Sequence, residues 1–254
     1  MPHGSQVLIG LDIGTTSVKA VMLTQEGRSL ASYSAAHPTR RSMPGMAEQD
    51  PATWLMHVGA ALAQFARHPR ARDVSGIGIT SQVNTHVFCD ASMAALAPAL
   101  TWQDTRPGQV ARDIDGRLTL AERIQALGAP IPVDASHALA RMAWMAQTAP
   151  EIWAATRHVL LPKDWVIAQL TGAVASDPLS AIGLAGTDLR YAQTMLSLIP
   201  RAAEVLPPLL DPLCITGALR DGPFRGVPIA TGTMDAWAAM IGLWCVAFRV
   251  QCGP

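Results

Sequence analysis

Hydrophobic and polar positions alternate along the first 36 residues in a way that predicts strands. We expect one strand over Val7–Gly14, a second over Ser17–Thr24 after a tight turn, and a third over Ser29–Ala36. From Ala52 to Ala66 the apolar residues recur instead at helical spacing. Asp50-Pro51 just before them provides a helix start with proline at the first helical position. The chain therefore opens with three strands and a helix.

The remainder of the chain alternates between strand patterns and helix patterns. Val74–Ser81 is apolar enough for a buried strand, and we expect Thr85–Cys89 to continue it or to pair with it as a hairpin. The other expected elements are a strand at Ala99–Gln103, two helices within residues 108–148 separated by Ala129–Pro132, a strand at His158–Leu161, a helix at Asp164–Leu170, a strand at Val227–Thr231 and a helix at Met234–Leu243. This order predicts an α/β domain with a mixed sheet flanked by helices.

Composition narrows the class of protein. Half of the 254 residues are apolar and 15% are charged, which favours a compact globular chain, and no repeat or low-complexity linker divides it. Lys plus Arg equals Asp plus Glu at 19 each, so neither nucleic acid nor an anionic membrane is indicated as a partner. The chain shows no signal-peptide pattern, no apolar run that predicts a membrane span and no C-x-x-C pair among its four cysteines. We therefore expect a cytoplasmic protein with reduced thiols.

The turn between the first two strands is the first candidate for chemistry. Gly14 and the hydroxyl residues Thr15 and Thr16 are suited to present backbone N–H groups and side-chain donors to a phosphate. Asp12, at the end of a strand, is suited to hold a magnesium ion through water, and Lys19 to supply a nearby positive charge. Taken alone, the segment also fits an ordinary hairpin turn.

A second candidate is Gly232–Trp237, at the junction between a strand and a helix. Phosphoryl transfer to an alcohol needs a group that accepts the hydroxyl proton, and Asp235 is suited to that task. The alternative is that Asp235 only caps the helix. A strand ending in D-x-G-T-T followed later by G-x-x-D at a helix start is the layout of the actin-like ATPase and sugar kinase fold.

The two motifs belong to a set of short sequence motifs that occur in a fixed order along the chain. These motifs are Gly10–Lys19, Glu48–Pro51 with Trp54, Ile79–Gln82 with Asp90, Trp102–Arg106, Leu161–Trp165 with Leu170–Gly172, Ser176-Asp177 and Gly232–Asp235. In these segments the chain resembles the FGGY carbohydrate kinases, a family that includes xylulokinases, glycerol kinases and gluconokinases. The resemblance covers residues 7–243 and implies a ribonuclease H-like fold. It argues against a chaperone or cytoskeletal ATPase of the same superfamily, because Glu48–Pro51 and Trp102–Arg106 resemble only the sugar kinases.

The resemblance also implies an activity and its cofactors. The expected reaction is the ATP-dependent phosphorylation of a hydroxyl of a small sugar or polyol, with Mg²⁺ as the metal. Asp235 is then the catalytic base, and Asp12 and Asp235 are the metal-binding residues. The residues implied at the ATP phosphates are Asp12, Gly14, Thr15, Thr16 and Lys19.

The same resemblance places residues at the sugar. Gln82, Val83 and Asn84 are implied on a substrate loop, and Trp102 is implied to pack against the bound polyol. Asp104 and Arg106 are expected to form a structural ion pair. Residues 82–85 read Q-V-N-T, which matches neither the Q-M-H-G of xylulokinases nor the Q-R-E-T of glycerol kinases, so the identity of the sugar stays open.

The expected organisation is a flexible N-terminus at 1–6, a substrate-binding N-terminal kinase domain at 7–243 and a tail at 244–254 unlike the family's continuation. We expect the C-terminal lobe to be absent and the truncated chain to be inactive alone. A homodimer or a separately encoded lobe are the expected partners. The alternative is a non-catalytic sugar-binding or regulatory remnant, against which the presence of both Asp12 and Asp235 counts.

Overall fold

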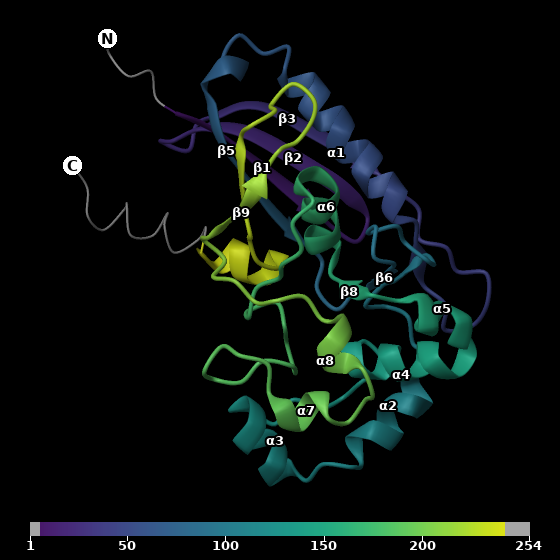
Figure 1. Cartoon of the computed structure of the whole chain (residues 1–254). Coiled ribbons are helices and arrows are strands. Elements are labelled where there is room, and N and C mark those ends of the chain that lie inside the picture. The colour runs from purple at the N-terminus through teal and green to yellow at the C-terminus, as the bar shows by residue number, and fades with distance from the viewer. Residues whose placement is uncertain (1–5, 242–254) are drawn as a thin grey trace.

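The main sheet of the molecule is mixed, and it begins with an antiparallel meander. The computed structural model describes residues 6–241. Its first strands are β1 (Val7–Ile13), β2 (Ser17–Thr24) and β3 (Ser29–Ala36), which lie in the order β3-β2-β1 (Figure 1). The three strands predicted for the start of the chain are confirmed, except that Gly14 falls in the turn.

Two parallel strands extend the sheet on the other side of β1. β5 (Val74–Ser81) runs parallel to β1, and β10 (Pro228–Ala230) runs parallel to β5. The far edge is β9 (Ile215–Ala218), which the sequence pattern did not predict and which pairs with β10 in antiparallel fashion. The full order is β3-β2-β1-β5-β10-β9. The predicted α/β class with a mixed sheet is therefore confirmed.

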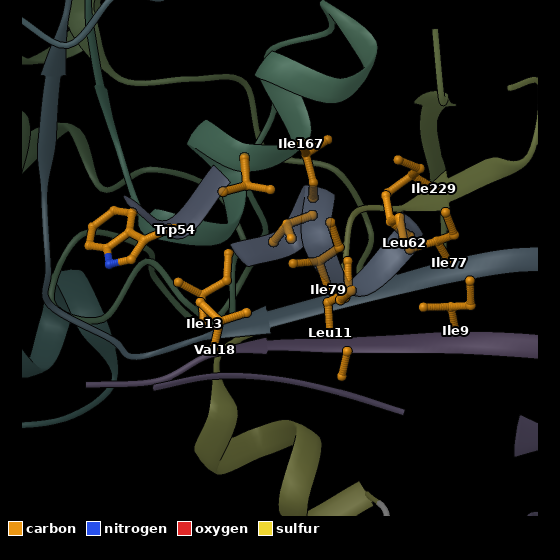
Figure 2. Close-up of a cluster of buried hydrophobic side chains, with 14 of the residues drawn as sticks. Ile9, Leu11, Ile13, Val18, Trp54, Leu62, Ile77, Ile79, Ile167 and Ile229 are labelled. Atoms are coloured by element: carbon orange, nitrogen blue, oxygen red, sulfur yellow. The ribbon is translucent and has the colours of Figure 1, made fainter. Parts of the chain in front are cut away.

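Two helices cover one face of this sheet, and Figure 2 shows the apolar layer between them and the strands. They are α1 (Pro51–Phe65) and α6 (Pro162–Thr171). The Asp50 side chain caps α1 by accepting from the Ala52 amide at 2.9 Å, as expected for a helix with proline at its first position. We call this layer the sheet core; its members include Ile9, Leu11, Ile13, Val18, Trp54, Leu62, Ile77, Ile79, Ile167 and Ile229.

Six further α-helices gather beyond one end of the sheet around a second apolar cluster, which we call the helical core (Figure 1). Its central side chains include Ile114, Leu139, Met142 and Met195. The helices are α2 (Gly108–Asp115), α3 (Leu120–Leu127), α4 (Ala138–Thr148), α5 (Pro150–Ala155), α7 (Gln193–Leu196) and α8 (Ala202–Val205).

The prediction of two helices within residues 108–148 was wrong, because three form there. α2 ends at Asp115, with Gly116 as its C-cap, and α3 begins at Leu120 after its N-cap Thr119. Thr119 and Glu122 form a capping box at that start, in which the threonine hydroxyl accepts from the Glu122 amide at 3.2 Å. The predicted break at Ala129–Pro132 does separate α3 from α4.

A small two-stranded sheet lies between the two cores. β6 (Val87–Cys89) is separate from β5 and pairs in antiparallel fashion with β8 (His158–Leu160). Both alternatives expected for Thr85–Cys89, a continuation of β5 and a hairpin with it, were therefore wrong. Val87 and Cys89 face the sheet core, whereas Phe88 faces the helical core. Because successive side chains of a strand point to opposite faces, this sheet packs against the sheet core on one face and against the helical core on the other.

The remaining expectations differ from the structure mainly in their bounds. The strand expected at Ala99–Gln103 is only β7 (Ala99–Leu100), which pairs with β4 (Glu48–Gln49), and a 3₁₀ turn (Ala71–Asp73) precedes β5. The last described helix starts at Asp235 and is followed to residue 241. Residues 242–243 of that predicted helix, the tail at 244–254 and most of the N-terminus at 1–6 lie outside the described residues. Every helix between residues 6 and 241 is too short or too polar to cross a bilayer.

Candidate functional site

The candidate site lies where three parallel strands end. Asp12 is near the end of β1, Gln82 directly follows β5, and Asp235 follows β10 after a four-residue turn at 231–234. The carboxyl ends of neighbouring parallel strands meet at one edge of a sheet, which is where α/β proteins bind ligands. The sheet topology therefore brings together residues that are far apart in the sequence.

Asp12 and Asp235 lie within electrostatic reach of each other. Burial raises the pKa of the Asp12 carboxyl, and the negative charge of Asp235 raises it further. Lys19, the cross-strand neighbour of Asp12 on β2, acts in the opposite direction. Since Leu11 and Ile13 face the sheet core, the alternation of β1 turns Asp12 toward the opposite face, on which the helix of residues 235–241 lies.

The surroundings of Asp12 fit a magnesium ion bound together with phosphate. Its Oδ1 atom is buried and has no hydrogen-bond partner among residues 6–241. Within the same range no group of three or more His, Cys, Asp and Glu side chains is placed to hold a metal. Mg²⁺ is suited to such a sparse site, because it usually keeps several waters and binds one or two carboxylates plus substrate phosphates.

The turn after Asp12 is held in place by buried polar groups. The Gln49 side-chain amide donates to the Thr15 carbonyl oxygen at 2.7 Å and accepts from the Gln82 amide at 2.9 Å. The imidazole Nε2 of His37 donates to the Gly14 carbonyl oxygen at 3.1 Å. A Cβ on Gly14 would lie 3.2 Å from the Ser17 carbonyl oxygen, so the turn packs closely on itself. Thr16 is exposed beside it.

The predicted substrate loop leaves the sheet directly after β5. Gln82 is buried, and its backbone amide donates to the Ile13 carbonyl oxygen at 3.0 Å. Val83 is half-buried. Asn84 adopts a left-handed backbone conformation with φ of 50°, which asparagine tolerates better than most residues. Its side-chain amide donates to the Ser136 hydroxyl at 3.1 Å.

Trp102 lies next to the Asp12 turn. Its indole Nε1 donates to the Thr15 hydroxyl at 2.9 Å, and its backbone amide donates to the buried Thr85 hydroxyl at 3.1 Å. The side chain remains 47% exposed, which leaves part of the ring available for contact with a ligand. The structure thus ties the expected sugar-stacking residue to the expected phosphate turn.

The expected ion pair of Asp104 and Arg106 is confirmed as a structural one. Arg106 Nη2 lies 2.6 Å from Asp104 Oδ2 and 2.7 Å from Glu48 Oε1, and Asp104 is fully buried. Asp104 Oδ2 also accepts from the Ala47 amide at 2.9 Å. The guanidinium lies over the ring of Trp144, 4.8 Å from its centroid. These contacts hold the segment after Trp102 against the chain before α1.

A cavity of about 520 Å³ opens on the face of the sheet that carries Asp12. Its polar lining comes from Asp12, Lys19, Thr80 and Thr233, and most of its wall is apolar. Ala238 and Ile241, from the helix that begins at Asp235, close one side. The cavity is therefore bounded by the strands of the Asp12 turn and by the helix of Asp235.

The turn that leads to Asp235 has an unusual backbone. Gly232 has a φ of 66°, and a Cβ there would collide with the carbonyl oxygen of Ile79 on β5, so only glycine fits. Asp235 itself is half-buried, and its Oδ1 accepts from the Ala236 amide at 2.8 Å. This contact within the first helical turn leaves the second carboxylate oxygen without an assigned bond among the described residues.

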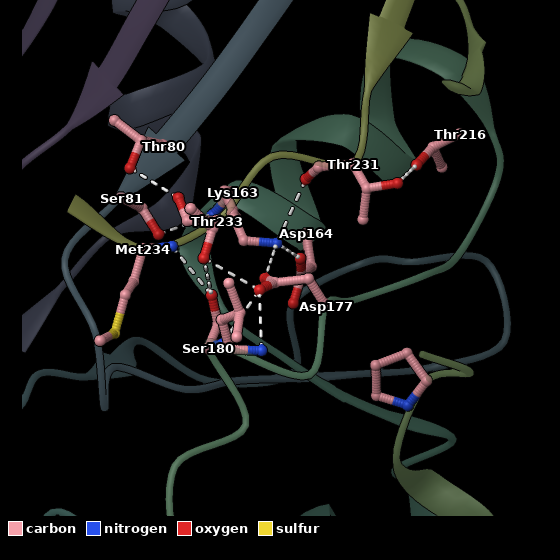
Figure 3. A network of polar contacts seen from close by, with 12 residues as sticks. Thr80, Ser81, Lys163, Asp164, Asp177, Ser180, Thr216, Thr231, Thr233 and Met234 are labelled. Carbon is pink, nitrogen blue, oxygen red and sulfur yellow. Dashed lines mark hydrogen bonds and ion pairs between the residues drawn. The ribbon is translucent and has the colours of Figure 1, made fainter. Parts of the chain in front are cut away.

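Sequence reasoning assigned no role to several residues that support the site. Gln49 and Ser136 bond to the Asp12 turn and to Asn84, and Lys163 with Asp177 lies beneath the turn before Asp235 (Figure 3). Three of these four residues lie within or beside segments quoted for the family resemblance, which was the available signal. Nothing in the sequence marks Ser136 as a partner of Asn84.

Comparison with known proteins extends this description. Residues 7–242 match the family described as "FGGY family of carbohydrate kinases, N-terminal domain". The chain is 32% identical over 246 residues to the xylulose kinase of Streptomyces coelicolor, covering 93% of this chain and 50% of that protein. It is 28% identical over 246 residues to the xylulose kinase of Escherichia coli, with 94% and 50% covered.

Solved structures show the same fold. A xyloylose kinase from Brucella ovis superposes with a TM-score of 0.82 at 28% identity, covering 92% of this chain and 48% of that chain. The glycerol kinase of Plasmodium falciparum with ADP gives a TM-score of 0.85 at 20% identity, with 94% and 50% covered. The chain spans about half the length of the relatives it matches. It belongs to the FGGY family of carbohydrate kinases and has the ribonuclease H-like fold of that family's N-terminal domain.

Proposed function

We propose that this domain serves an ATP-dependent kinase that phosphorylates a hydroxyl of a small sugar or polyol. The observation that carries the proposal is the meeting of Asp12 and Asp235 at one edge of the sheet, with the charge of one acting on the other. A helix cap alone would not require a second carboxylate close by. Because it consumes ATP, we assign the reaction to the cytoplasm.

Each side chain then has a definite task. Asp235 accepts the proton of the sugar hydroxyl as that oxygen bonds to the γ-phosphorus of ATP, while the bond from this phosphorus to the bridging oxygen breaks and ADP leaves. Asp12 and Asp235 would hold Mg²⁺, and the backbone of Gly14 and the hydroxyls of Thr15 and Thr16 would bind the phosphates. Lys19 lies near them. When bound, Mg²⁺ with ATP supplies the transferable phosphoryl group and neutralises its developing negative charge.

The sugar itself is bound by the segment after β5 and by Trp102. Asn84 both donates and accepts hydrogen bonds, which suits a ligand rich in hydroxyl groups. The Trp102 ring offers an apolar surface to the C–H face of the sugar. The xylulose kinases among the relatives favour a small ketose, and we take D-xylulose as the first ligand to test.

Catalysis by the chain alone is expected to be very weak. Phosphoryl transfer depends on positioning and on charge neutralisation from several sides, and the matched relatives are about twice as long as this chain. A counterpart of the half of the relatives that this chain does not match would complete the site; a second copy of this chain is the other candidate partner. The chain alone should therefore bind sugar weakly, hydrolyse almost no ATP and transfer almost no phosphoryl group from ATP to the sugar.

Calorimetry and a coupled kinase assay test the proposal together. The chain is titrated with D-xylulose, other pentuloses and polyols, with and without Mg²⁺ and ATP. It is then assayed alone and mixed with the separately produced C-terminal half of the Streptomyces coelicolor xylulose kinase, with Asp235→Asn as the matched control. Sugar binding and a lobe-dependent turnover that Asp235→Asn abolishes would support the proposal. Tight sugar binding that neither ATP nor the lobe affects would instead indicate a non-catalytic sugar-binding protein.

A further inference from the structure

A group of fully buried charges lies beneath the turn that carries Asp235 (Figure 3). The Lys163 ammonium is 2.6 Å from Asp164 Oδ1 and 2.9 Å from Asp177 Oδ2. All three side chains are at most 1% exposed. Removing such ions from water costs several kcal/mol each, and apolar side chains of similar volume are often at least as stabilising. Core stability alone therefore does not account for the charges.

The charges contact the turn at two points. Lys163 Nζ donates to the Thr231 carbonyl oxygen at 3.3 Å. The Thr233 hydroxyl donates to Asp177 Oδ1 at 2.9 Å, and the same oxygen accepts from the Ser180 amide at 3.0 Å. Lys163 and Asp177 thus connect the start of α6 and the segment at 176–180 to residues just before Asp235.

Two hydroxyl groups hold the remaining part of the turn. Ser180 Oγ accepts from the Met234 amide at 2.9 Å, and Thr80 Oγ1 donates to the Thr233 carbonyl oxygen at 2.6 Å. Each of Thr231, Thr233 and Met234 is therefore bonded to a group outside the turn. We call these outside groups the turn clamp; its members are Thr80, Lys163, Asp177 and Ser180.

Directional bonds of this kind fix a backbone more sharply than apolar packing does. A catalytic base must lie within hydrogen-bond reach of the proton it removes, and a displacement of about 1 Å can lower the rate on the order of 100-fold. We infer that Lys163, Asp177 and Ser180 are positioning residues, which hold the turn at 231–234 so that Asp235 faces the sugar hydroxyl. The inference rests on the proposed role of Asp235, and no clamp side chain is required to touch the sugar.

A double-mutant cycle tests whether the clamp acts through Asp235. The variant Ser180→Ala removes one acceptor and leaves the buried charges intact, so it is the first choice, with Asp177→Asn as the stronger variant. The affinity for D-xylulose is measured by calorimetry for each, with Asp235 present and in the Asp235→Asn background. We expect Ser180→Ala to weaken binding about 10-fold when Asp235 is present and less than about 2-fold when it is absent. Equal losses in the two backgrounds would show a merely structural role and overturn the inference.

Amide hydrogen exchange supplies a readout that needs no sugar. Ser180→Ala is expected to lower protection at residues 232–236 by about 10-fold while leaving β1 and α1 unchanged, because only a local opening becomes easier. The matched control is Thr156→Val, which also removes a buried hydroxyl but one that bonds within its own helical segment, to the Ile152 carbonyl oxygen. Unchanged exchange at 232–236, or a loss spread evenly over the chain, would contradict the clamp. If the wild-type chain does not bind D-xylulose, the proposed sugar is wrong, while the exchange result still decides whether the clamp holds the turn.

Discussion

The indole of Trp102 is hydrogen-bonded to the hydroxyl of Thr15, 87 positions earlier in the chain, at 2.9 Å. The bond joins the residue expected to meet the sugar to the turn expected to meet the phosphates. A kinase must bring these two ligands together in one orientation. The contact gives the domain a direct physical connection between the two halves of the site.

We therefore expect substitutions of Trp102 to separate ring contact from hydrogen bonding. Trp102→Ala should weaken D-xylulose binding about 10-fold or more, since it removes the aromatic surface, a loss of about 1.4 kcal/mol. Trp102→Phe keeps a ring but loses the bond to Thr15, and should show a smaller loss. Titration calorimetry measures both, and Trp153→Phe, in the helical part, serves as the control. Full affinity in Trp102→Ala would remove this residue from the sugar site.

Gln49 is expected to be a stability determinant of the Asp12 turn. Gln49→Ala would remove the donor to the Thr15 carbonyl oxygen and would leave the buried Gln82 amide with only its 3.5 Å contact to the Gly14 carbonyl oxygen. This should lower the free energy of unfolding by about 1–3 kcal/mol. Urea denaturation provides the measurement. The control is Gln64→Ala, because Gln64 bonds to the Ser32 carbonyl oxygen at the surface and its loss should change stability by less than about 0.5 kcal/mol. Equal effects of the two variants would be evidence against this role.

The glycine before Asp235 should tolerate no side chain. In Gly232→Ala the new Cβ would collide with the Ile79 carbonyl oxygen, a backbone atom that cannot easily move. We therefore expect the free energy of unfolding to fall by clearly more than the positive φ alone would cost. Gly222 offers a matched control, since its φ is 87° but nothing lies within 4 Å of its Cβ position. Gly222→Ala should cost about 1–2 kcal/mol. Thermal or urea unfolding measures the stability of both variants. Similar losses of stability would contradict the close approach of β5 to Gly232.

Stability is expected to fall as the pH is lowered from 6.5 to 4. Burial lowers the pKa of His137 from its ordinary 6.5 to about 4. In this window the unfolded chain binds a proton at this residue and the folded protein does not, so folding is disfavoured by up to about 3 kcal/mol at pH 4 and below. Above pH 6.5 the histidine is neutral in both the folded and the unfolded chain, so this penalty is absent.

His137→Asn is the variant that isolates this effect. Asparagine can replace the imidazole as the acceptor from the Leu139 amide at the start of α4, but it does not titrate. The difference in unfolding free energy between wild type and variant should therefore shrink or change sign as the pH falls. His86 is also buried with a lowered pKa, caused first by burial and then by the charges of Arg141 and His137. It acts in the same direction in both proteins, and the variant removes only the smallest of these causes. A difference that stays constant between pH 7 and pH 4 would refute the assignment.

The parts of the fold that the sequence predicted are those with a clear local period. β1 and β2 alternate, and α1 combines helical spacing with an Asp-Pro start, so their bounds were nearly correct. β6 and β8 have only three residues each and are apolar on both faces, so no local pattern shows which strand they pair with. Their pairing depends on contacts between segments about 70 residues apart, which the pattern of one segment does not contain.

Within the candidate site, only the residues that belong to sequence motifs could be predicted. The motifs placed Asp12 and Asp235 on the ends of two strands, and the order of those strands in the sheet was then needed to bring them to one edge. Lys163 and Asp177 belong to residue types that are usually exposed, so composition gives no reason to place them in the interior. Their burial follows from the contacts of α6 with the turn before Asp235, which is tertiary information.

The thin β6–β8 sheet makes this domain a structure with two separately packed interiors. The proposed phosphate site is built on the sheet core, whereas Asn84 donates a hydrogen bond to Ser136, two residues before α4 of the helical core. Substitutions in the helical core can therefore change the proposed sugar site around Asn84 without disturbing β1, the strand that carries Asp12. With such a division, the residues around the proposed sugar site can change while the proposed phosphate site keeps its support.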